Sequence, residues 1–430
     1  MIDPRPLEDR LKPRFWYGWI VLAIVFGVMA TLIGVRNSLG FFFKDMAGEF
    51  GWSRAQIAAA YSVGMIAQGA ASPLAGWLSD RWGPRRTISA GVLIGGSALL
   101  LASSVQRLWQ LYLMYALLSV GFAAATFVPQ VHILSNWFAK KRGLAMGIST
   151  SSQGFATFLN LATPALIGLL GWRGSYTVLA GFALLITFPI SAAFLRNDPP
   201  EKFTVPDAPF LGIEERMTLS ARRTIPLLME APAPPGVWSR ILSLRFFLLA
   251  GLYAVNAFVF TGTVVHLVPH ATDQGFTLAG GSVIFIVWGG FIMAGNIASG
   301  VSDRIRRAPT YLAGALFGAV SAVLLGLIEP GAHPARFYAG AAMSGFSLGL
   351  LRPTVSSLTA DLFEGPGFGK INGAIMMVFG IFGALGAYVP GALFDGSRSY
   401  RSAFLLMAAT LALGGVIATA LSNTQANAQE

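Results

Sequence analysis

The sequence has no cysteine and few charged residues. Without Cys, neither a disulfide nor a Cys-based metal site exists. Charged types make up 11% of the 430 residues, whereas a soluble globular domain carries roughly 25%. Apolar types make up 54% of the chain, so the charges are too few to cover a water-facing surface. The composition therefore excludes an ordinary soluble protein and indicates that lipid is the main solvent.

Signals for catalysis are missing as well. Ser, His and Asp do not cluster, and no phosphate-cradling loop or nucleotide-binding domain is present. His266 and His270 lie one helical turn apart, but no third metal ligand accompanies them. We therefore expect no enzyme activity, no cofactor and no metal. The energy for any transport must come from a gradient of ions or solutes.

Long stretches without Asp, Glu, Lys or Arg follow one another along the chain. A helix needs about 20 apolar residues to cross a bilayer. Eleven such stretches occur, and a twelfth, 337–360, is interrupted only by Arg352. The eleven are 15–35, 55–79, 87–106, 108–139, 143–172, 174–195, 246–272, 274–302, 308–328, 371–394 and 402–429. Because strand-period alternation is absent, the sequence predicts an all-α integral membrane protein with twelve transmembrane helices.

Basic residues divide unevenly between the two sides that twelve crossings define. Of the 30 Lys and Arg residues, 21 lie on the side of the termini and 7 on the other side, and Arg36 and Arg352 fall inside spans. The positive-inside rule therefore places both termini in the cytoplasm and the protein in the inner (plasma) membrane. This distribution also explains the net charge of +11 without a nucleic-acid partner.

A proline-rich polar segment separates six spans from six. We predict an N-terminal six-helix bundle over 1–195, a cytoplasmic linker over 196–244 and a C-terminal six-helix bundle over 245–430. Motifs recur in the same order in both halves. Gly76-Trp-Leu-Ser-Asp80-Arg81 after span 2 matches Gly300-Val-Ser-Asp303-Arg304 after span 8. This repetition indicates two pseudo-symmetric bundles that hold a solute between them near the membrane midplane.

The loop after span 2, Gly76-Trp-Leu-Ser-Asp80-Arg81-Trp-Gly83-Pro-Arg85-Arg86, resembles the signature loop of the major facilitator superfamily. The resemblance covers the whole chain. It implies that spans 1, 4, 7 and 10 line a central cavity and that the bundles rock between inward-open and outward-open states.

In that loop we expect Asp80 to lie near the positive N-terminal end of span 11. With Arg81, Arg85, Asp303 and Arg304, it would latch the cytoplasmic side. In the latch the arginines can pair with acidic loop residues or with lipid headgroups, and the alternative is that they only fix the topology.

Within the superfamily the chain resembles bacterial monocarboxylate porters and oxalate/formate exchangers. The resemblance lies in Trp16-Tyr-Gly-Trp19, Val35-Arg36-Asn-Ser-Leu-Gly-Phe-Phe-Phe43, Gly51-Trp52-Ser53, Arg142-Gly143-Leu-Ala-Met-Gly147 and Val265-His266-Leu-Val-Pro269. Relatives often carry Arg in span 8 and acidic residues in span 10. Here these places read Gly295-Asn296 and Leu351-Arg352-Pro353-Thr354. The resemblance implies a secondary carrier of small organic anions, with monocarboxylates as the expected class, working by proton coupling or anion exchange.

Arg352 is the sharpest candidate for the solute site. A charge inside a span costs several kcal/mol unless it faces a cavity. No Asp or Glu occupies the middle of a span to neutralise Arg352, so we expect an anionic cargo to neutralise it. The alternative is that Arg352 pairs structurally with Asp361 or with helix-end carbonyl groups. Arg36 lies either in the cavity, which we favour, or at the outer interface.

Other polar or aromatic residues inside spans are weaker candidates, because amides often join helices and aromatics often fill cores. For His266 the sequence leaves two alternatives, which are a gating or proton-linked role and ordinary polar packing. The full set predicted to contact solute is Arg352, Arg36, Asn37, Asn256, Asn296, His266, Tyr115 and Phe127. The expected partners are a small organic anion, protons and the lipid bilayer, and we expect a monomer.

Two other functions compete with anion transport. Drug efflux members usually show a Gly-Pro-rich motif in span 5, and Leu161-Ala-Thr-Pro164-Ala-Leu-Ile-Gly168 matches it poorly. A membrane sensor with a carrier fold generally adds a signalling domain, and we expect none here because the sequence ends nine residues after Leu421.

Overall fold

All regular structure in the described part of the chain is helical. The computed structural model describes residues 17–138, 142–198, 237–301, 307–329, 331–363 and 368–426. In chain order the helices are α2 (Gly18–Asn37), η1 (Ser38–Phe42), α3 (Phe43–Phe50), α4 (Arg54–Trp82), α5 (Pro84–Ala102), α6 (Leu108–Ala125), α7 (Phe127–Trp137), α8 (Arg142–Leu159), η2 (Asn160–Ala162), α9 (Thr163–Gly181), η3 (Phe182–Thr187), α10 (Phe188–Phe194), α12 (Val237–Ile241), α13 (Leu244–Asp273), α14 (Leu278–Ala298), η5 (Ser299–Val301), α16 (Arg307–Gly326), α17 (Pro334–Phe363), α18 (Phe368–Ser397) and α19 (Arg401–Ala426).

Within these ranges the helices form twelve membrane crossings. Eight segments are long and apolar enough to span a membrane by length and composition alone. One of them, 145–194, contains two crossings, because Gly171 interrupts it with φ +67° and ψ 177°, a conformation that L side chains rarely adopt. The long helices α4, α5 and α17 supply the other three crossings. The predicted all-α membrane fold with twelve helices is confirmed.

Short polar residues set the start of several crossings. At the start of α4, the Gln56 N–H donates to Ser53 Oγ at 3.2 Å, and the Ser53 N–H donates to Gln56 Oε1 at 2.9 Å. This reciprocal pair is a capping box, which satisfies two backbone donors that have no partner inside the helix. The hydroxyls of Ser243 and Thr277 cap α13 and α14. These caps fix where the chain turns back into the membrane.

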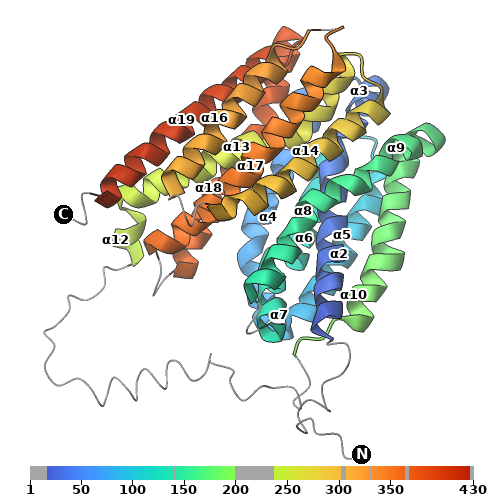
Figure 1. Cartoon of the computed structure of the whole chain (residues 1–430). Helices are drawn as coiled ribbons and strands as arrows, with labels where there is room; N and C mark the ends of the chain where they lie inside the picture. Colours follow the sequence, from blue (N-terminus) through green and yellow to red (C-terminus); the bar gives the residue numbers. More distant parts are fainter. Residues whose placement is uncertain are drawn as a thin grey trace, which may run out of the picture.

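The crossings gather into two bundles. Figure 1 shows α2 to α10, in blue and green, together on one side, and α13 to α19, in yellow to red, on the other. Along the seam α4 packs against α18, and α8 packs against α14. The boundaries predicted for the bundles stay a prediction. Residues 199–236 of the predicted linker lie outside the described residues.

Glycines bring α14 and α17 close together in the second bundle. A Cβ on Gly349 would lie 2.2 Å from the Ile292 carbonyl oxygen, and one on Gly295 would lie 2.3 Å from the Phe346 carbonyl oxygen. Small residues at membrane helix interfaces permit this close backbone approach. By contrast, a Cβ on Gly290 of α14 meets nothing within 4 Å.

We therefore expect Gly349→Ala to destabilise the folded protein by about 1–3 kcal/mol, because the two helices must separate to admit the methyl group. Gly290→Ala is the matched control, and we expect it to be neutral or slightly stabilising, since Ala favours a helix over Gly. Thermal unfolding in detergent, followed by tryptophan fluorescence, measures both. Equal melting temperatures for the two variants would contradict the role given to Gly349.

Candidate functional site

A small cavity of about 30 Å³ lies between the two bundles. Its lining comes from α2, α4, α7, α8, α13, α17 and α18, and Gln68, Phe260 and Phe379 sit near the middle of their helices. The lining residues are Ile33, Arg36, Asn37, Met65, Gln68, Phe127, Gln153, Phe260, Arg352 and Phe379. Two of these described residues are cationic and none is Asp or Glu. The cavity therefore lies near the midplane and carries uncompensated positive charge.

Arg36 enters the cavity from the first crossing. It lies at the end of α2, just before the 3₁₀ turn η1, and is only 8% exposed. Its Nη1 donates to Gln68 Oε1 at 2.5 Å, and its guanidinium lies 4.0 Å from the centroid of the Phe122 ring. Its Nε has no hydrogen-bond partner among the described residues. Arg36 thus keeps an unused donor as well as its charge.

Arg352 brings the second positive charge from the other bundle. Its Nη1 donates a hydrogen bond to Gln153 Oε1 on α8, so this contact crosses between the bundles. The ring centroids of Phe127, Phe260 and Phe379 lie 5.7–5.8 Å from its guanidinium. Aromatic faces attract a cation only weakly, and an amide oxygen carries no net charge. A carboxylate in place of the amide oxygen would form a much stronger hydrogen bond with the Arg352 guanidinium, because the carboxylate carries a negative charge.

Asp361, the acidic residue nearest to Arg352 in the sequence, is engaged elsewhere. Its Oδ2 accepts a hydrogen bond from Arg307 Nε at 3.0 Å. The alternative of a structural pair between Arg352 and Asp361 is therefore not realised. In the described part of the chain, Arg352 forms no ion pair with an acidic side chain.

Two further predicted solute contacts also line the cavity. Asn37 follows Arg36 on α2 and accepts a hydrogen bond from the Tyr61 hydroxyl at 3.2 Å, and Phe127 begins α7. Gln68 and Gln153 also line the cavity but are not among the residues that the sequence predicts to contact solute. The structure adds that each accepts a hydrogen bond from one of the two arginines.

Four other residues predicted to contact solute are not among the lining residues. Tyr115 of α6 is buried, with its hydroxyl 3.3 Å from that of Tyr176. Asn256 is buried in α13, and its amide has no partner among the described residues. Asn296 lies on α14 where Gly349 of α17 approaches. The fourth residue, His266, belongs to a separate network, and contact of these four residues with solute stays a prediction.

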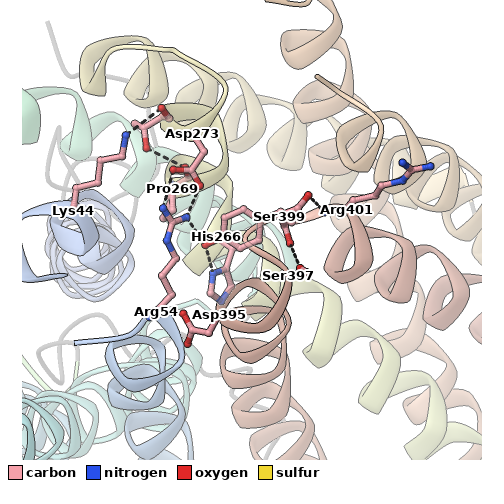
Figure 2. A network of polar contacts seen from close by, with 11 residues as sticks. Lys44, Arg54, His266, Pro269, Asp273, Asp395, Ser397, Ser399 and Arg401 are labelled. Carbon is pink, nitrogen blue, oxygen red and sulfur yellow. Dashed lines mark hydrogen bonds and ion pairs between the residues drawn. The ribbon is translucent and has the colours of Figure 1, made fainter. Parts of the chain in front are cut away.

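Polar contacts join the two bundles at one end (Figure 2). Arg54, the first residue of α4, donates to the two carboxylate oxygens of Asp273, at the end of α13, at 2.5 and 2.7 Å. The backbone N–H groups of Arg54 and Ala55 donate to Asp395 of α18 at 3.0 and 2.9 Å. The Tyr400 hydroxyl accepts from Arg54 at 3.0 Å. We call Arg54, Asp273, Asp395 and Tyr400 the Arg54 latch.

His266 lies beside the Arg54 latch and is fully buried. Its Nδ1 lies 3.0 Å from the Tyr400 hydroxyl, and its Nε2 lies 2.8 Å from the Ala387 carbonyl oxygen. Nearby, Lys44 Nζ donates to the Thr272 carbonyl oxygen at 3.1 Å. Because both ring nitrogens have partners, His266 supports the latch in this state, and its predicted gating role stays a prediction.

The signature loop lies at the opposite end of α4 from the latch. Asp80 has an 81% exposed side chain, and its Oδ1 lies 3.7 Å from His132 Nδ1. The sequence predicts that Asp80 lies near the start of span 11, but in the described residues Asp80 forms no hydrogen bond or ion pair with α18, which is span 11. Asp303 and Arg304, the second half of the predicted gate, lie outside the described residues.

The two arginines predicted to act with Asp80 make different contacts. The Arg81 guanidinium lies 5.3 Å from the centroid of the Trp77 ring. Arg85 donates to the Ala192 carbonyl oxygen through Nε at 3.1 Å and through Nη2 at 2.5 Å. Both contacts stay within the first bundle. The latching role of these residues therefore remains a prediction for a different state of the carrier.

A sequence profile described as Major Facilitator Superfamily matches residues 20–335 and 297–428, which together span nearly the whole chain. The chain belongs to the major facilitator superfamily. Membership agrees with the two six-helix bundles of the fold, and it makes the protein a membrane transporter of a small molecule and not an enzyme.

Curated superfamily members resemble the chain over almost its full length. Monocarboxylate transporter 13 of Bos taurus is 29% identical over 414 residues, which cover 95% of this chain and 90% of that protein. Monocarboxylate transporter 11 of Mus musculus is 28% identical over 433 residues, which cover 97% and 89%. The resemblance to monocarboxylate porters inferred from the sequence motifs is confirmed.

Among solved structures, a bacterial homologue of the human lysosomal transporter Spinster, in an inward-facing and unoccupied conformation, has the same fold. Its TM-score is 0.70 at 16% identity, and the match covers 95% of this chain and 97% of that one.

Proposed function

We propose that this superfamily member is a secondary active transporter of small organic anions, with monocarboxylates as its cargo. One observation carries the proposal: Arg36 and Arg352, from opposite bundles, share a cavity whose described lining residues include no carboxylate. Charged residues within a membrane persist where a cavity or a counter-charge stabilises them. A cargo carboxylate supplies that counter-charge. The relatives named monocarboxylate transporters support the same class.

The size of the cavity supports a small cargo. About 30 Å³ exceeds the roughly 10–15 Å³ that a cavity needs to hold one water molecule. A short carboxylate needs only a modest expansion of this space, whereas the bulky apolar solutes of drug efflux carriers need a much larger one. The pair of arginines also disfavours apolar or cationic drugs. Efflux is therefore the weaker alternative.

The transport cycle follows from where the contacts between the bundles lie. With both termini in the cytoplasm of the cell, as the positive-inside rule assigns them, the Arg54 latch closes the outer end. The cargo would replace Gln153 at Arg352, and its departure would restore that bond. None of the described residues that line the cavity is an Asp or Glu that could carry a proton. A coupled proton would therefore travel on the cargo or on a histidine, and anion exchange would need no proton.

Proteoliposome uptake tests the proposal. We expect saturable uptake of labelled lactate or pyruvate, stimulated either by an inward proton gradient or by a preloaded anion, which separates symport from exchange. Lactamide, a neutral analogue of similar shape, should compete at least about 100-fold less well, because it offers no charge to the arginines. If lactamide competed as well as lactate, the anion assignment would be wrong.

A further inference from the structure

A second cavity, of about 560 Å³, lies on the flank of the first bundle, where α4 ends and α5 begins. It is lined by Trp82, Arg85, Arg86, Ser89, Ala192 and Asn197. None of these residues lines the cavity of Arg36 and Arg352. This second site is therefore separate from the proposed transport path.

The chain builds this site rigidly. Gly83 adopts φ +82°, and a Cβ there would lie 2.4 Å from Asn197 Nδ2, so only glycine fits the turn. Asn197 Oδ1 in turn accepts from the Arg85 N–H at 2.8 Å and caps the first turn of α5. The Arg85 side chain donates to the Ala192 carbonyl oxygen near the end of α10. The start of α5 and the end of α10 are thus tied together around the cavity.

Two donors in the cavity are left without partners. Arg86 is exposed, and in the described part of the chain it makes no hydrogen bond or ion pair. Ser89 is only 8% exposed, and its Oγ has no hydrogen-bond partner there. The two residues are three positions apart and so lie on the same face of α5. Because Ser89 lines the cavity, a ligand with acceptor oxygens that reached its hydroxyl would give that group the partner it lacks.

The chemistry of the site fits a phosphate group. Arginine side chains bind phosphate oxygens through charge-assisted hydrogen bonds, and the N-terminal end of a helix favours negative charge. Here Arg85, Arg86 and the start of α5 meet at one place, and Ser89 offers a hydroxyl one turn further along the helix. Among the described residues of the lining, none is Asp or Glu.

The surroundings indicate that the phosphate belongs to a lipid. Along α5, Leu93 and Leu100 follow Arg86 at intervals of seven residues and are 44% and 47% exposed. On the neighbouring α10, Ile190 and Phe194 are 41% and 54% exposed. These apolar stripes face the hydrocarbon region and offer a surface for acyl chains. A freely soluble phosphate would make no use of them.

We propose that this cavity binds the headgroup phosphate of an anionic phospholipid, whose acyl chains lie along α5 and α10. With the termini in the cytoplasm, the site lies in the cytoplasmic leaflet, where basic pockets between helices recognise anionic headgroups. The lipid would hold the signature loop of the carrier against the end of α10. It acts on the first bundle and is not cargo.

Native mass spectrometry of the full-length protein in a mild detergent tests this site. Phosphatidylglycerol should remain bound in preference to phosphatidylcholine with the same acyl chains. Arg86→Gln and Ser89→Ala should each weaken phosphatidylglycerol binding by about fivefold, as expected for the loss of one contact to the headgroup. Arg196→Gln is the matched control, because Arg196 is exposed near the same end of α10 but does not line the cavity.

Several results would overturn the lipid site. Equal loss with Arg196→Gln would show that diffuse surface charge attracts the lipid. Binding unchanged in Ser89→Ala would show that the headgroup does not reach the cavity, and equal retention of phosphatidylcholine would remove the selectivity for anionic lipid. Full displacement by millimolar inorganic phosphate would identify a site for soluble phosphate. Melting temperatures in lipid-free detergent establish that each variant is folded, and the readout does not depend on transport.

Discussion

Replacing Arg352 by glutamine is expected to weaken monocarboxylate binding by about 100-fold or more. A hydrogen bond to a charged group contributes about 1.5–3 kcal/mol, and a guanidinium can donate two to one carboxylate. Each 1.4 kcal/mol corresponds to about a tenfold change in affinity. The glutamine side chain would keep polarity in the cavity while removing the charge. Equilibrium binding of a labelled carboxylate to the purified carrier measures the effect without any driving gradient.

Two further variants sharpen the test of Arg352. Arg352→Lys keeps the charge and loses the planar pair of donors, so we expect an intermediate loss of about tenfold. Arg307→Gln is the control, since it removes an arginine that pairs with Asp361 away from the cavity, and affinity should stay unchanged. If Arg352→Gln bound the carboxylate as tightly as the parent protein, the proposed anion site would be lost, although the carrier fold would stand.

The sequence predicts the fold of this carrier well because the membrane imposes a simple rule on it. Each crossing must consist of about 20 residues with almost no charge, and such stretches are visible without knowledge of tertiary contacts. Even the break between the fifth and sixth crossings, predicted near Arg173, lies close by at Gly171. Arg36 and Arg352 stood out for the same reason, since a cation is conspicuous inside an apolar run.

Other residues of the site cannot be recognised in the sequence in this way. Phe260 and Phe379 line the cavity, but they are two of 32 phenylalanines, and in lipid an apolar residue can face any direction. Asn256 has the polarity of a solute contact, yet it is not among the lining residues, because polarity within a span indicates burial but not orientation. Which face a helix turns towards the seam depends on its neighbours.

The Arg54 latch was equally hidden from the sequence. Arg54 and Asp273 are 219 positions apart, and each lies at the end of an apolar stretch, where charges are ordinary. Only the packing of α4 against α18, which brings Arg54 to the end of α13, reveals that Arg54 and Asp273 form one ion pair between the bundles. Pairing between loop charges of different halves has no periodic pattern that a single sequence could display.

Replacing Arg54 by alanine is expected to shift the carrier strongly towards opening at the latch end. The Arg54 and Asp273 side chains are only 14% and 23% exposed, so the pair is largely shielded from water. Removing one partner of a buried ion pair costs about 3–5 kcal/mol. Because that cost applies only to the latched state, the open population should rise by about 100-fold, the factor that about 3 kcal/mol gives.

Because the chain contains no cysteine, a single introduced cysteine can be labelled specifically to measure opening at the latch end. Ser62 lies on α4 between the latch and the cavity, is 9% exposed, and donates to the Ala384 carbonyl oxygen of α18 at 2.6 Å. A single cysteine introduced by Ser62→Cys would be shielded while α4 and α18 stay together. We expect maleimide labelling of this cysteine to accelerate at least about tenfold when Arg54→Ala is added, because labelling follows the open population.

Arg173→Ala supplies the matched control for the latch. Arg173 Nη1 lies 2.5 Å from Glu49 Oε1, a distance like that in the latch, but this pair joins α9 to α3 within the first bundle. Its loss removes an ion pair without favouring either arrangement of the bundles, so labelling at position 62 should not change. Exchanging the charges with Arg54→Asp and Asp273→Arg should slow labelling again. Equal acceleration by Arg173→Ala would mean general loosening, since only contacts that differ between two states can shift the balance between them.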